Sequence, residues 1–365
     1  MATNLIPNVK HVIAVASGKG GVGKSTVSAN LALALAGNGS KVAIMDADVY
    51  GPSIPTILGI TEKPKSVDGR ILPVEKFGLK IISMGFFIAA NEAVIWRGPM
   101  LHKMVNDFLN IVDWGELDYL IIDLPPGTGD IQLSLCQTIS LTGAVIVSTP
   151  QDVAWNVAQK AIVMFDKLNT PVLGIVENMS RYTCSQCGHG EEIFGHGGAK
   201  RAAQVLEIPF FGEIPLETSL RKASDEGAPI VLSKPDSAAS LAFFHIVDHL
   251  KSEINRQSSQ SSKIVPKKVG AAGQPEILIE WNDGSLGVYP SRELRLACPC
   301  ATCVDEWSGQ KIIDSKNVPS DIRPVALNSI GRYALQVQWS DGHATGLYSF
   351  EFLRKFSPKS ISKTS

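Results

Sequence analysis

The stretch Gly18-Lys19-Gly20-Gly21-Val22-Gly23-Lys24-Ser25 decides the fold, because it satisfies the pattern G-x-x-x-x-G-K-[S/T] of a phosphate-binding loop. The apolar run Val12–Ala16 precedes it, and a helical pattern over Thr26–Leu35 follows it. Glycines let successive backbone N–H groups turn towards phosphate oxygens, and the following helix adds the positive end of its dipole. We therefore expect residues 18–26 to bind a nucleotide, with Lys24 on its β- and γ-phosphates and Ser25 on Mg²⁺.

Outward from this loop, short apolar runs alternate with helical patterns up to about residue 250. The runs are rich in Val and Ile and have no polar face, as is typical of buried parallel strands. They comprise Val42–Met45, Lys80–Met84, Tyr119–Ile122, Ala144–Val147 and Val172–Val176. Helices between parallel strands imply right-handed crossovers. The pattern predicts an α/β domain over residues 1–252, with a doubly wound, mostly parallel sheet.

Acidic residues follow two of these runs. Asp46 and Asp48 come directly after one run, and Asp123 ends another, the position of the acid that holds the Mg²⁺ shell in phosphate-binding-loop proteins. Open α/β sheets bind ligands outside the carboxyl ends of their strands, so we expect these side chains near the loop. Gly127, in the stretch L-P-P-G-T-G-D, is expected to donate its N–H to the γ-phosphate. For Asp46, a capping or supporting role is an equal alternative.

Composition excludes several classes of protein. The 365 residues are 44% hydrophobic and 19% charged with a net charge of −1, which gives no support for broad nucleic-acid binding. No apolar stretch reaches the roughly 18 residues that span a bilayer, and Met1–Lys10 has no secretory pattern. We expect a cytoplasmic protein whose cysteines are metal ligands or buried thiols rather than disulfides. Cys136, in an apolar helical pattern, is expected to be buried and inert.

The composition changes after the α/β pattern. Residues 253–275 are rich in Ser, Gln, Lys, Gly and Pro, and we expect a flexible linker there. A small α+β domain over residues 276–358 should follow. It contains two related stretches, W-N-D-G at Trp281 and W-S-D-G at Trp339, each predicting a hairpin followed by a short helix. The two tryptophans are interpreted as core residues.

Cys184 and Cys187 form a C-x-x-C pair within a glycine-rich stretch. The pair alone leaves four hypotheses open: a redox pair, a zinc site completed by His189 and His196, part of a larger site, or a pair with no ligand.

Cys298, Cys300 and Cys303 form a second cluster, C-P-C-A-T-C. Tetrahedral zinc needs one more ligand, and His343, after the turn of the second hairpin, is the best candidate. Two alternatives are a second iron–sulfur site and three cysteines without metal.

Lys19 makes the phosphate-binding loop similar to that of a particular group of ATPases. A second lysine early in the loop resembles the deviant Walker A motif of the dimerising ATPases that include MinD, ParA and the nitrogenase iron protein. The resemblance implies that Lys19 reaches the phosphates, from within the chain or across a dimer interface, much as an arginine finger does. It also implies that Asp48 orients the attacking water and that Asn178 reads the adenine edge.

Four further segments together resemble the Mrp/ApbC family of iron–sulfur cluster carriers: D-A-D-V-Y-G-P-S-I-P, L-P-P-G-T-G-D, V-E-N-M-S and the C-x-x-C-G that follows it. This resemblance implies a homodimer that binds a 4Fe–4S cluster and transfers it to apo-proteins, with slow ATP hydrolysis coupled to the transfer. A 4Fe–4S cluster commonly takes four thiolates, so Cys184 and Cys187 of two copies would complete the site. Scaffold and client proteins are the implied partners, with no membrane and no nucleic acid.

The C-terminal region resembles the small domain at the front of γ-butyrobetaine hydroxylase-like enzymes. In those enzymes a C-x-C-x-x-C and a distant histidine hold structural zinc, which implies zinc on Cys298, Cys300, Cys303 and His343. Hydroxylase activity is not implied, because the chain has no room for the catalytic domain.

Two functional alternatives belong to other classes. A MinD- or ParA-like positioning ATPase acts on membrane or DNA and predicts an amphipathic or basic segment, whereas the tail F-S-P-K-S-I-S-K-T-S is polar. A reductase partner like the nitrogenase iron protein takes its cluster thiols from widely separated single cysteines, so the C-x-x-C spacing argues against it.

Overall fold

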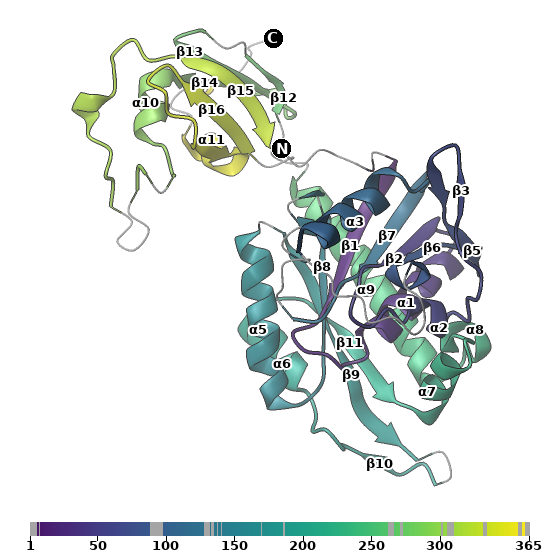
Figure 1. Ribbon diagram of the computed structural model, residues 1–365. Coiled ribbons are helices and arrows are strands. Elements are labelled where there is room, and N and C mark those ends of the chain that lie inside the picture. The colour runs from purple at the N-terminus through teal and green to yellow at the C-terminus, as the bar shows by residue number, and fades with distance from the viewer. Residues whose placement is uncertain are drawn as a thin grey trace. The chain divides into compact units, whose positions relative to one another are not determined.

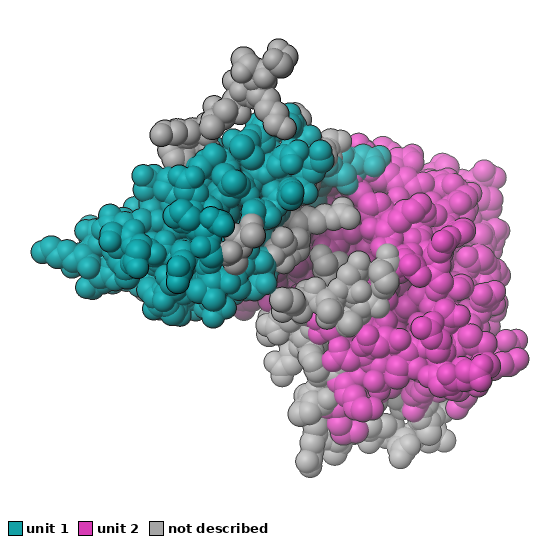
Figure 2. All heavy atoms as spheres, turned by 90° about the horizontal axis from the view of Figure 1, so that it is seen from above, with its two compact units in different colours: residues 1, 255–365 teal, residues 2–254 magenta. Residues whose placement is uncertain are grey.

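The structure is a computed structural model that describes residues 6, 8–87, 98–127, 132, 135–136, 138–139, 141–168, 170–184, 187–261, 266–270, 273–300, 302–304, 310–330, 334–356 and 360–361. The chain divides into two compact units, residues 2–254 and 255–365, each of which is treated by itself (Figures 1 and 2). Residues 128–130 of the L-P-P-G-T-G-D stretch lie outside the described residues.

Within the described residues, the first unit is built around a nine-stranded sheet. Its strands are β1 (Val9–Ala16), β2 (Val42–Asp46), β5 (Val74–Lys76), β6 (Leu79–Ser83), β7 (Leu117–Asp123), β8 (Gly143–Ser148), β9 (Val172–Thr183), β10 (Gly190–Glu191) and β11 (Phe210–Leu216). Its helices are α1 (Lys24–Gly37), α2 (Ile54–Ile57), α3 (Gly98–Asn110), α5 (Asp152–Lys167), α6 (Gly198–Val205), α7 (Thr218–Asp225), α8 (Ile230–Ser233) and α9 (Ala238–Ser261), with a 3-10 turn η1 (Met84–Phe86). A separate hairpin consists of β3 (Lys65–Val67) and β4 (Arg70–Leu72).

The strand order is β10-β9-β8-β1-β7-β2-β6-β5, and β11 also pairs with β9. Pairs between β1, β2, β6, β7, β8, β9 and β11 are parallel, whereas β5 and β10 add antiparallel edges. In this register Asp46 and Asp123 are direct neighbours on β2 and β7. The carboxyl ends of the central strands therefore bring both acids to the edge where the phosphate-binding loop begins.

Two hydrophobic cores cover the two faces of the sheet. Ile13 and Val15 of β1 pack into the core under α1 and α9, whereas Val12 and Ala14 pack into the core under α3, α5 and α6. Figure 1 shows α5 and α6 together beside one face. Side chains of a strand alternate between faces, so a strand apolar at every position must be covered on both sides. The predicted doubly wound α/β fold is confirmed.

Strand β9 is longer than predicted. The apolar run Val172–Val176 predicts five residues, but the strand continues to Thr183 through the polar stretch E-N-M-S-R-Y-T. Pairing with β11 on one side and with β10 near its end supplies the hydrogen bonds of this extension. Because these residues are not uniformly apolar, hydrophobic pattern alone does not reveal them.

The expected linker over residues 253–275 is partly wrong. Helix α9 continues to Ser261, and β12 (Pro266–Val269) follows. A helix already anchored by a buried face extends at little cost into Ser, Gln and Asn, because propagation is easier than nucleation. No helix within the described part of the chain combines the length and apolar character that crossing a membrane requires.

The second unit is a small α+β structure. Its strands are β12, β13 (Glu276–Trp281), β14 (Leu286–Pro290), β15 (Pro324–Ile330), β16 (Ala334–Trp339), β17 (Leu347–Ser349) and β18 (Ser360–Ile361), and its helices are α10 (Ser291–Leu296), η2 (Ser315–Asn317) and α11 (Phe350–Phe356). They form the sheets β12-β13-β14-β18 and β15-β16-β17. Trp281 and Trp339 are each 1% exposed in one shared core, so the predicted core role is confirmed. β12 and β18 extend the first sheet beyond the expected limits of residues 276–358.

Candidate nucleotide and metal sites

The phosphate-binding loop connects β1 to α1 at the carboxyl edge of the sheet. Gly21 and Gly23 have φ angles of 79° and 78°, a left-handed conformation that glycine adopts without strain. A Cβ atom on Gly23 would lie 2.3 Å from Asn178 Nδ2, so the close approach also requires glycine. Lys24 is the first residue of α1. The loop therefore lies between a strand and a helix, as the sequence motif predicts.

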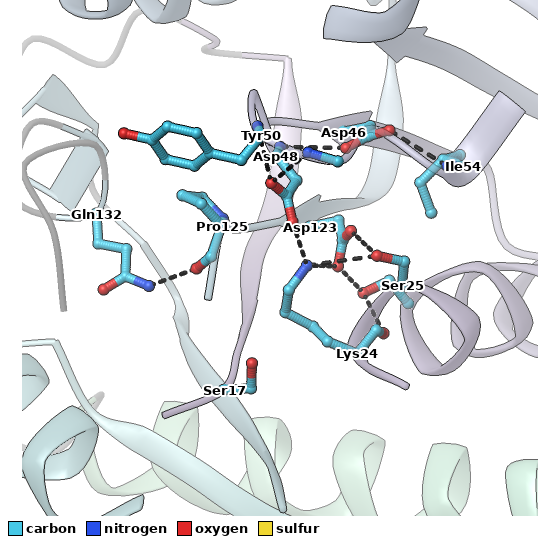
Figure 3. A network of polar contacts seen from close by, with 12 residues as sticks. Ser17, Lys24, Ser25, Asp46, Asp48, Tyr50, Ile54, Asp123, Pro125 and Gln132 are labelled. Atoms are coloured by element: carbon cyan, nitrogen blue, oxygen red, sulfur yellow. Dashed lines mark hydrogen bonds and ion pairs between the residues drawn. The ribbon is translucent and has the colours of Figure 1, made fainter. Parts of the chain in front are cut away.

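Behind the loop, three predicted residues contact one another. Lys24 Nζ lies 2.8 Å from Asp123 Oδ1, and Ser25 Oγ donates a hydrogen bond of 2.6 Å to Asp123 Oδ2. Figure 3 shows these side chains pointing towards one another. Ser28 Oγ also donates to Asp123 Oδ1 at 2.6 Å, although Ser28 is missing from the predicted site. Its position one helical turn after Lys24 was the available signal.

Asp48 approaches the same lysine from β2. Its Oδ2 lies 3.7 Å from Lys24 Nζ, and its Oδ1 accepts hydrogen bonds of 3.2 Å from the N–H groups of Tyr50 and Gly51. The carboxylate is therefore fixed by its own loop, at a distance from the lysine that leaves room for movement between them.

Asp46 has a supporting role. It is fully buried beside Asp123, and its Oδ2 accepts hydrogen bonds from the Ser83 hydroxyl at 2.8 Å and from the N–H of Ile54 at 3.3 Å. Ile54 is the first residue of α2, so the capping alternative fits Asp46. Burial, together with the charge of Asp123, raises the pKa of Asp46 to about 8.

Asn178 and Gly127 contact the loop from two sides. Asn178 Nδ2 donates a hydrogen bond of 2.8 Å to the carbonyl oxygen of Val22. Gly127 has a φ of 94° and donates its N–H to the carbonyl oxygen of Ser17 at 2.9 Å. Both residues thus lie at the nucleotide site, while contacts with adenine and with the γ-phosphate stay predictions.

Lys19 is held within its own chain. Its Nζ donates a hydrogen bond of 2.8 Å to Gln151 Oε1. Gln151 lies directly before α5, just beyond the carboxyl end of β8, and it is missing from the predicted site. The rule that located Asp48 and Asp123, namely that ligand-binding residues follow parallel strands, also points to Gln151.

The first cysteine pair lies at the tip of a β-hairpin. Cys184 directly follows β9, its N–H donates to the carbonyl oxygen of His189 at 2.9 Å, and β10 then pairs back against Tyr182 and Thr183. Cys187 is exposed and Cys184 is half-buried. The pair therefore follows a strand and does not open a helix, the context of a thioredoxin-like redox pair.

Two histidines, His189 and His196, lie close to the thiol pair in the sequence. His189 is exposed, and His196 Nε2 lies 3.3 Å from Glu213 Oε2 of β11. Among the described residues, no third cysteine, histidine or acid joins Cys184 and Cys187 in a group with metal-ligand spacing. The structure therefore gives no support for zinc bound within one chain by these residues, and that alternative stays an untested prediction.

Glu177 fixes the segment that follows the thiol pair. Its buried carboxylate accepts hydrogen bonds from the N–H groups of Gly197 at 3.1 Å and Ala199 at 2.7 Å, at the start of α6. A Cβ atom on Gly198 would lie 2.2 Å from the carbonyl oxygen of Pro150. Burial raises the pKa of Glu177. Strand β9 thus carries, on consecutive residues, one contact to α6 and one to the phosphate-binding loop.

The second cysteine cluster is brought together by two distant segments. The cysteines follow α10, and His343 lies in the turn between β16 and β17. Cys298 and Cys303 are 1% and 3% exposed. His343 Nε2 lies 3.2, 3.4 and 3.8 Å from the sulfur atoms of Cys298, Cys300 and Cys303. All four ligand atoms lie within 4.8 Å of one another, so the predicted residues form one group.

These distances fit a single tetrahedral ion. Zinc bonds of about 2.3 Å to sulfur and about 2.0–2.1 Å to nitrogen separate the two kinds of ligand by about 3.6 Å. The thiolates of an iron–sulfur cluster bind different iron atoms and lie farther apart. The geometry therefore favours one ion over a second iron–sulfur site.

Two thiols of this cluster differ in acidity. Burial alone would raise the pKa of the Cys300 thiol, but hydrogen bonds with Thr302, Thr345 and the neighbouring thiols lower it to about 5. Burial raises the pKa of Cys298 to about 12. Thiols of such a group lose their protons as a metal binds.

The loop, the lysine and the acid behind it define the first unit as a P-loop nucleoside triphosphatase. A family model described as NUBPL iron-transfer P-loop NTPase matches residues 8–251, and the chain belongs to this family. A second model, described as gamma-butyrobetaine hydroxylase-like, N-terminal, matches residues 270–354. Both predicted resemblances are confirmed.

Several relatives are about half identical to this chain. The iron-sulfur cluster carrier protein of Escherichia coli K12 is 48% identical over 266 residues, which are 72% of this chain and 71% of that protein. The iron-sulfur cluster carrier protein of Aquifex aeolicus is 51% identical over 244 residues, 66% of this chain and 67% of that protein. The mouse iron-sulfur cluster transfer protein NUBPL is 49% identical over 248 residues, 67% and 78% of the two chains.

Solved structures share the fold of the first unit. A nucleotide-binding protein from Archaeoglobus fulgidus, in complex with ADP, is 42% identical with a TM-score of 0.58, covering 67% of this chain and 97% of that chain. The cell division ATPase MinD of Pyrococcus furiosus is 23% identical with a TM-score of 0.52, covering 67% and 99%, and shows the likeness of fold alone.

Proposed function

We propose that the protein is an ATP-dependent iron–sulfur cluster carrier. Two copies hold a 4Fe–4S cluster between their Cys184 and Cys187 thiols and transfer it to apo-proteins. The single observation that carries this proposal is the two-thiol hairpin tip on β9, the strand that also contacts the phosphate-binding loop through Asn178. Relatives of about half identity that are named iron–sulfur cluster carriers support the cargo and favour it over a positioning role on membrane or DNA.

The dimer follows from the ligand count. A 4Fe–4S cluster commonly takes four thiolates, whereas the hairpin of one chain offers two. A two-fold axis between copies brings two identical pairs together and completes the set. Scaffold proteins would supply the cluster, and apo iron–sulfur proteins would receive it. An exposed site suits such exchange, because the recipient thiols need access to the iron atoms.

ATP with Mg²⁺ is the proposed nucleotide. Lys24 binds the β- and γ-phosphates, the Ser25 hydroxyl binds Mg²⁺, and Asp123 holds the water shell of the ion. The hydrogen bond of 2.6 Å between Ser25 and Asp123 fits this arrangement, since it keeps both oxygens on the same side of the loop. The ADP complex of the 42%-identical relative supports an adenine nucleotide, whose edge Asn178 would read.

Hydrolysis is proposed to be slow and coupled to transfer. Asp48 orients the attacking water, because its carboxylate is fixed beside the lysine that binds the phosphates. Gly127 exchanges its bond to Ser17 for one to the γ-phosphate, and Lys19 leaves Gln151 to stabilise the transition state.

Anaerobic reconstitution with iron and sulfide tests the cluster site. Wild-type protein should take up about four irons per dimer, and the Cys184→Ser/Cys187→Ser variant should take up none. Cys136→Ser is the matched control, because burial raises the pKa of that thiol to about 11 and leaves it inert. Unchanged iron uptake in the double variant would contradict the proposal.

The cluster Cys298, Cys300, Cys303 and His343 is proposed to hold zinc, which would supply structural cross-linking and no chemistry. Metal analysis of the purified protein should find about one zinc per chain, which remains after iron is removed. We further propose a reducing compartment, the cytoplasm, because none of the six cysteines, all of them described, is in a disulfide.

A further inference from the structure

The two W-x-D-G stretches of the second unit adopt the same local structure. Trp281 ends β13 and Trp339 ends β16, and each is followed by a tight turn, a second strand and a short helix. Gly284 and Gly342 occupy matching turn positions with φ angles of 80° and 85°. The unit therefore consists of two copies of one structural repeat.

Each repeat contributes an arginine that pairs with an aspartate in the turn of the other repeat. Arg295, at the end of the first repeat, places its Nε 2.8 Å from Asp341 Oδ2 in the turn of the second repeat. Arg354, at the end of the second repeat, binds Asp283 and Ser285 in the turn of the first. Each repeat thus holds the turn of the other by the same kind of ion pair.

The two arginine–aspartate pairs connect matching positions, but the residues around them differ. His343 of the second turn stands where the first turn has Ser285. Arg295 makes one contact that Arg354 does not match within the described residues: its Nη1 donates to Cys303 Sγ at 3.3 Å. The Arg295 side chain is also more buried, at 9% exposed against 33% for Arg354.

We propose that Arg295 is a positioning residue of the metal site formed by Cys298, Cys300, Cys303 and His343. The ligands come from two segments some forty residues apart, and Arg295 contacts both. Its guanidinium donates directly to the sulfur of Cys303. Through Asp341, which accepts the backbone N–H of His343 at 3.0 Å, it also fixes the turn that carries the histidine.

Charge supports the same role. Zinc with three thiolates and a neutral imidazole carries one net negative charge, which is costly in a buried site. A guanidinium that donates to one of the thiolates stabilises it through a charge-assisted hydrogen bond, as is common for metal ligands, while the same guanidinium is paired with Asp341. This inference rests on the proposed zinc site.

Zinc affinity in two matched variants tests the proposal. Full-length protein with Cys184→Ser/Cys187→Ser leaves only the second cluster to titrate with Zn²⁺ against a chromophoric chelator. Arg295→Met should weaken zinc binding by about 10- to 100-fold. Arg354→Met removes the sister ion pair and should leave zinc affinity within about twofold of the parent, although both variants should melt earlier.

A further substitution of Arg295 distinguishes the positioning role from simple misfolding. Arg295→Lys keeps the positive charge but cannot contact sulfur and carboxylate together, so zinc affinity should fall between the parent and Arg295→Met. The thiolate-to-metal charge-transfer band of the Co²⁺-loaded protein should shift in both Arg295 variants and not in Arg354→Met. Equal loss of affinity in Arg295→Met and Arg354→Met would overturn the positioning role. No zinc binding by the parent would instead overturn the zinc site itself.

Discussion

Two sites of this protein share the spacing C-x-x-C, at Cys184/Cys187 and at Cys300/Cys303, yet they differ in almost every other respect. The first pair stands at the tip of the β9–β10 hairpin with Cys187 exposed. The second lies in a core with a third cysteine and a histidine, and all four ligand atoms lie within 4.8 Å of one another. The same spacing therefore occurs at an exposed pair of thiols and within a four-residue group that has metal-ligand spacing.

The difference lies in how much of the ligand set one chain supplies. A complete, buried set holds an ion as part of the fold, because loss of the ion would leave thiolates buried without a partner. Under the proposed function, the exposed pair Cys184 and Cys187 needs a second copy to complete its ligand set, and separation of the copies would release the cluster. The following predictions test this contrast, from the largest expected effect to the smallest.

Removal of zinc should have the largest effect, and only on the second unit. Structural zinc contributes about 10–16 kcal/mol of apparent binding free energy in small domains, so a strong chelator should abolish the cooperative unfolding of this unit. Differential scanning calorimetry of the full-length protein should then show one transition fewer, with the transition of the first unit unchanged. Cys303→Ser should reproduce the result. Two intact transitions after verified zinc removal would contradict it.

Lys19→Ala should separate turnover from metal binding. A charge that acts in the transition state is worth at least about 10³-fold in kcat, or roughly 4 kcal/mol, so phosphate release should fall by that factor. Iron uptake and zinc content should not change. Lys41→Ala, a surface lysine paired with Glu116, is the matched control and should retain wild-type turnover. Wild-type phosphate release by the Lys19 variant would argue against the deviant Walker mechanism.

Gly198→Ala should destabilise the start of α6, the helix that follows Cys184 and Cys187 in the chain. The new Cβ atom would lie 2.2 Å from the carbonyl oxygen of Pro150, so α6 must shift, at a cost of about 1–3 kcal/mol. Urea unfolding should report this loss in the first unit, and Cys187 should react faster with an alkylating agent. Gly37→Ala has no atom within 4 Å of its new Cβ and should show neither effect. Equal stability of the two variants would show that α6 moves without cost.

Glu177→Gln should flatten the pH dependence of stability and also lower stability at every pH, because the amide replaces only one of the two oxygens that accept the N–H groups of Gly197 and Ala199. Burial raises the pKa of Glu177 in the folded protein, so the folded state binds its proton at a pH where the unfolded state has lost it. Stability therefore falls as pH rises from the unfolded pKa to the folded pKa, by at most about 1.4 kcal/mol per pH unit. The glutamine removes this titration and should flatten the slope in urea melts. An unaltered slope would show that the pKa of Glu177 is the same in the folded and unfolded states.

The fold was largely predictable where burial is uniform. Strands β1 and β8 contain the unbroken apolar runs Val12–Ala16 and Ala144–Val147, and these runs alone locate them. The end of β9 was not predictable, because its polar residues are stabilised by pairing with β10 and β11 rather than by burial. The end of α9 was not predictable for a similar reason, since its polar residues continue a helix that begins in the core.

The sites were predictable as far as local motifs reach. The phosphate-binding loop and the three cysteines of the second cluster follow from residue types at fixed spacing, whereas His343 was predicted from its place after a hairpin turn and from the family resemblance. The sequence did not predict Gln151, Ser28 and Arg295, none of which belongs to a recognisable motif. The contacts of these residues are with Lys19, Asp123 and Cys303. The arginine–aspartate pairs needed the structure, since the repeat in the sequence does not say which aspartate each arginine meets.

The length of β9 has an electrostatic consequence. Asn178 and Cys184 are six residues apart, which along a strand is about 20 Å at roughly 3.3 Å per residue. That separation exceeds the Debye length of about 8 Å at physiological ionic strength. The proposed nucleotide lies against the loop that Asn178 contacts and the proposed cluster lies near the far end of the strand, so solvent screening would weaken the repulsion between these anionic ligands. Charge repulsion would therefore not prevent both proposed ligands from binding at once, and β9 connects the two sites.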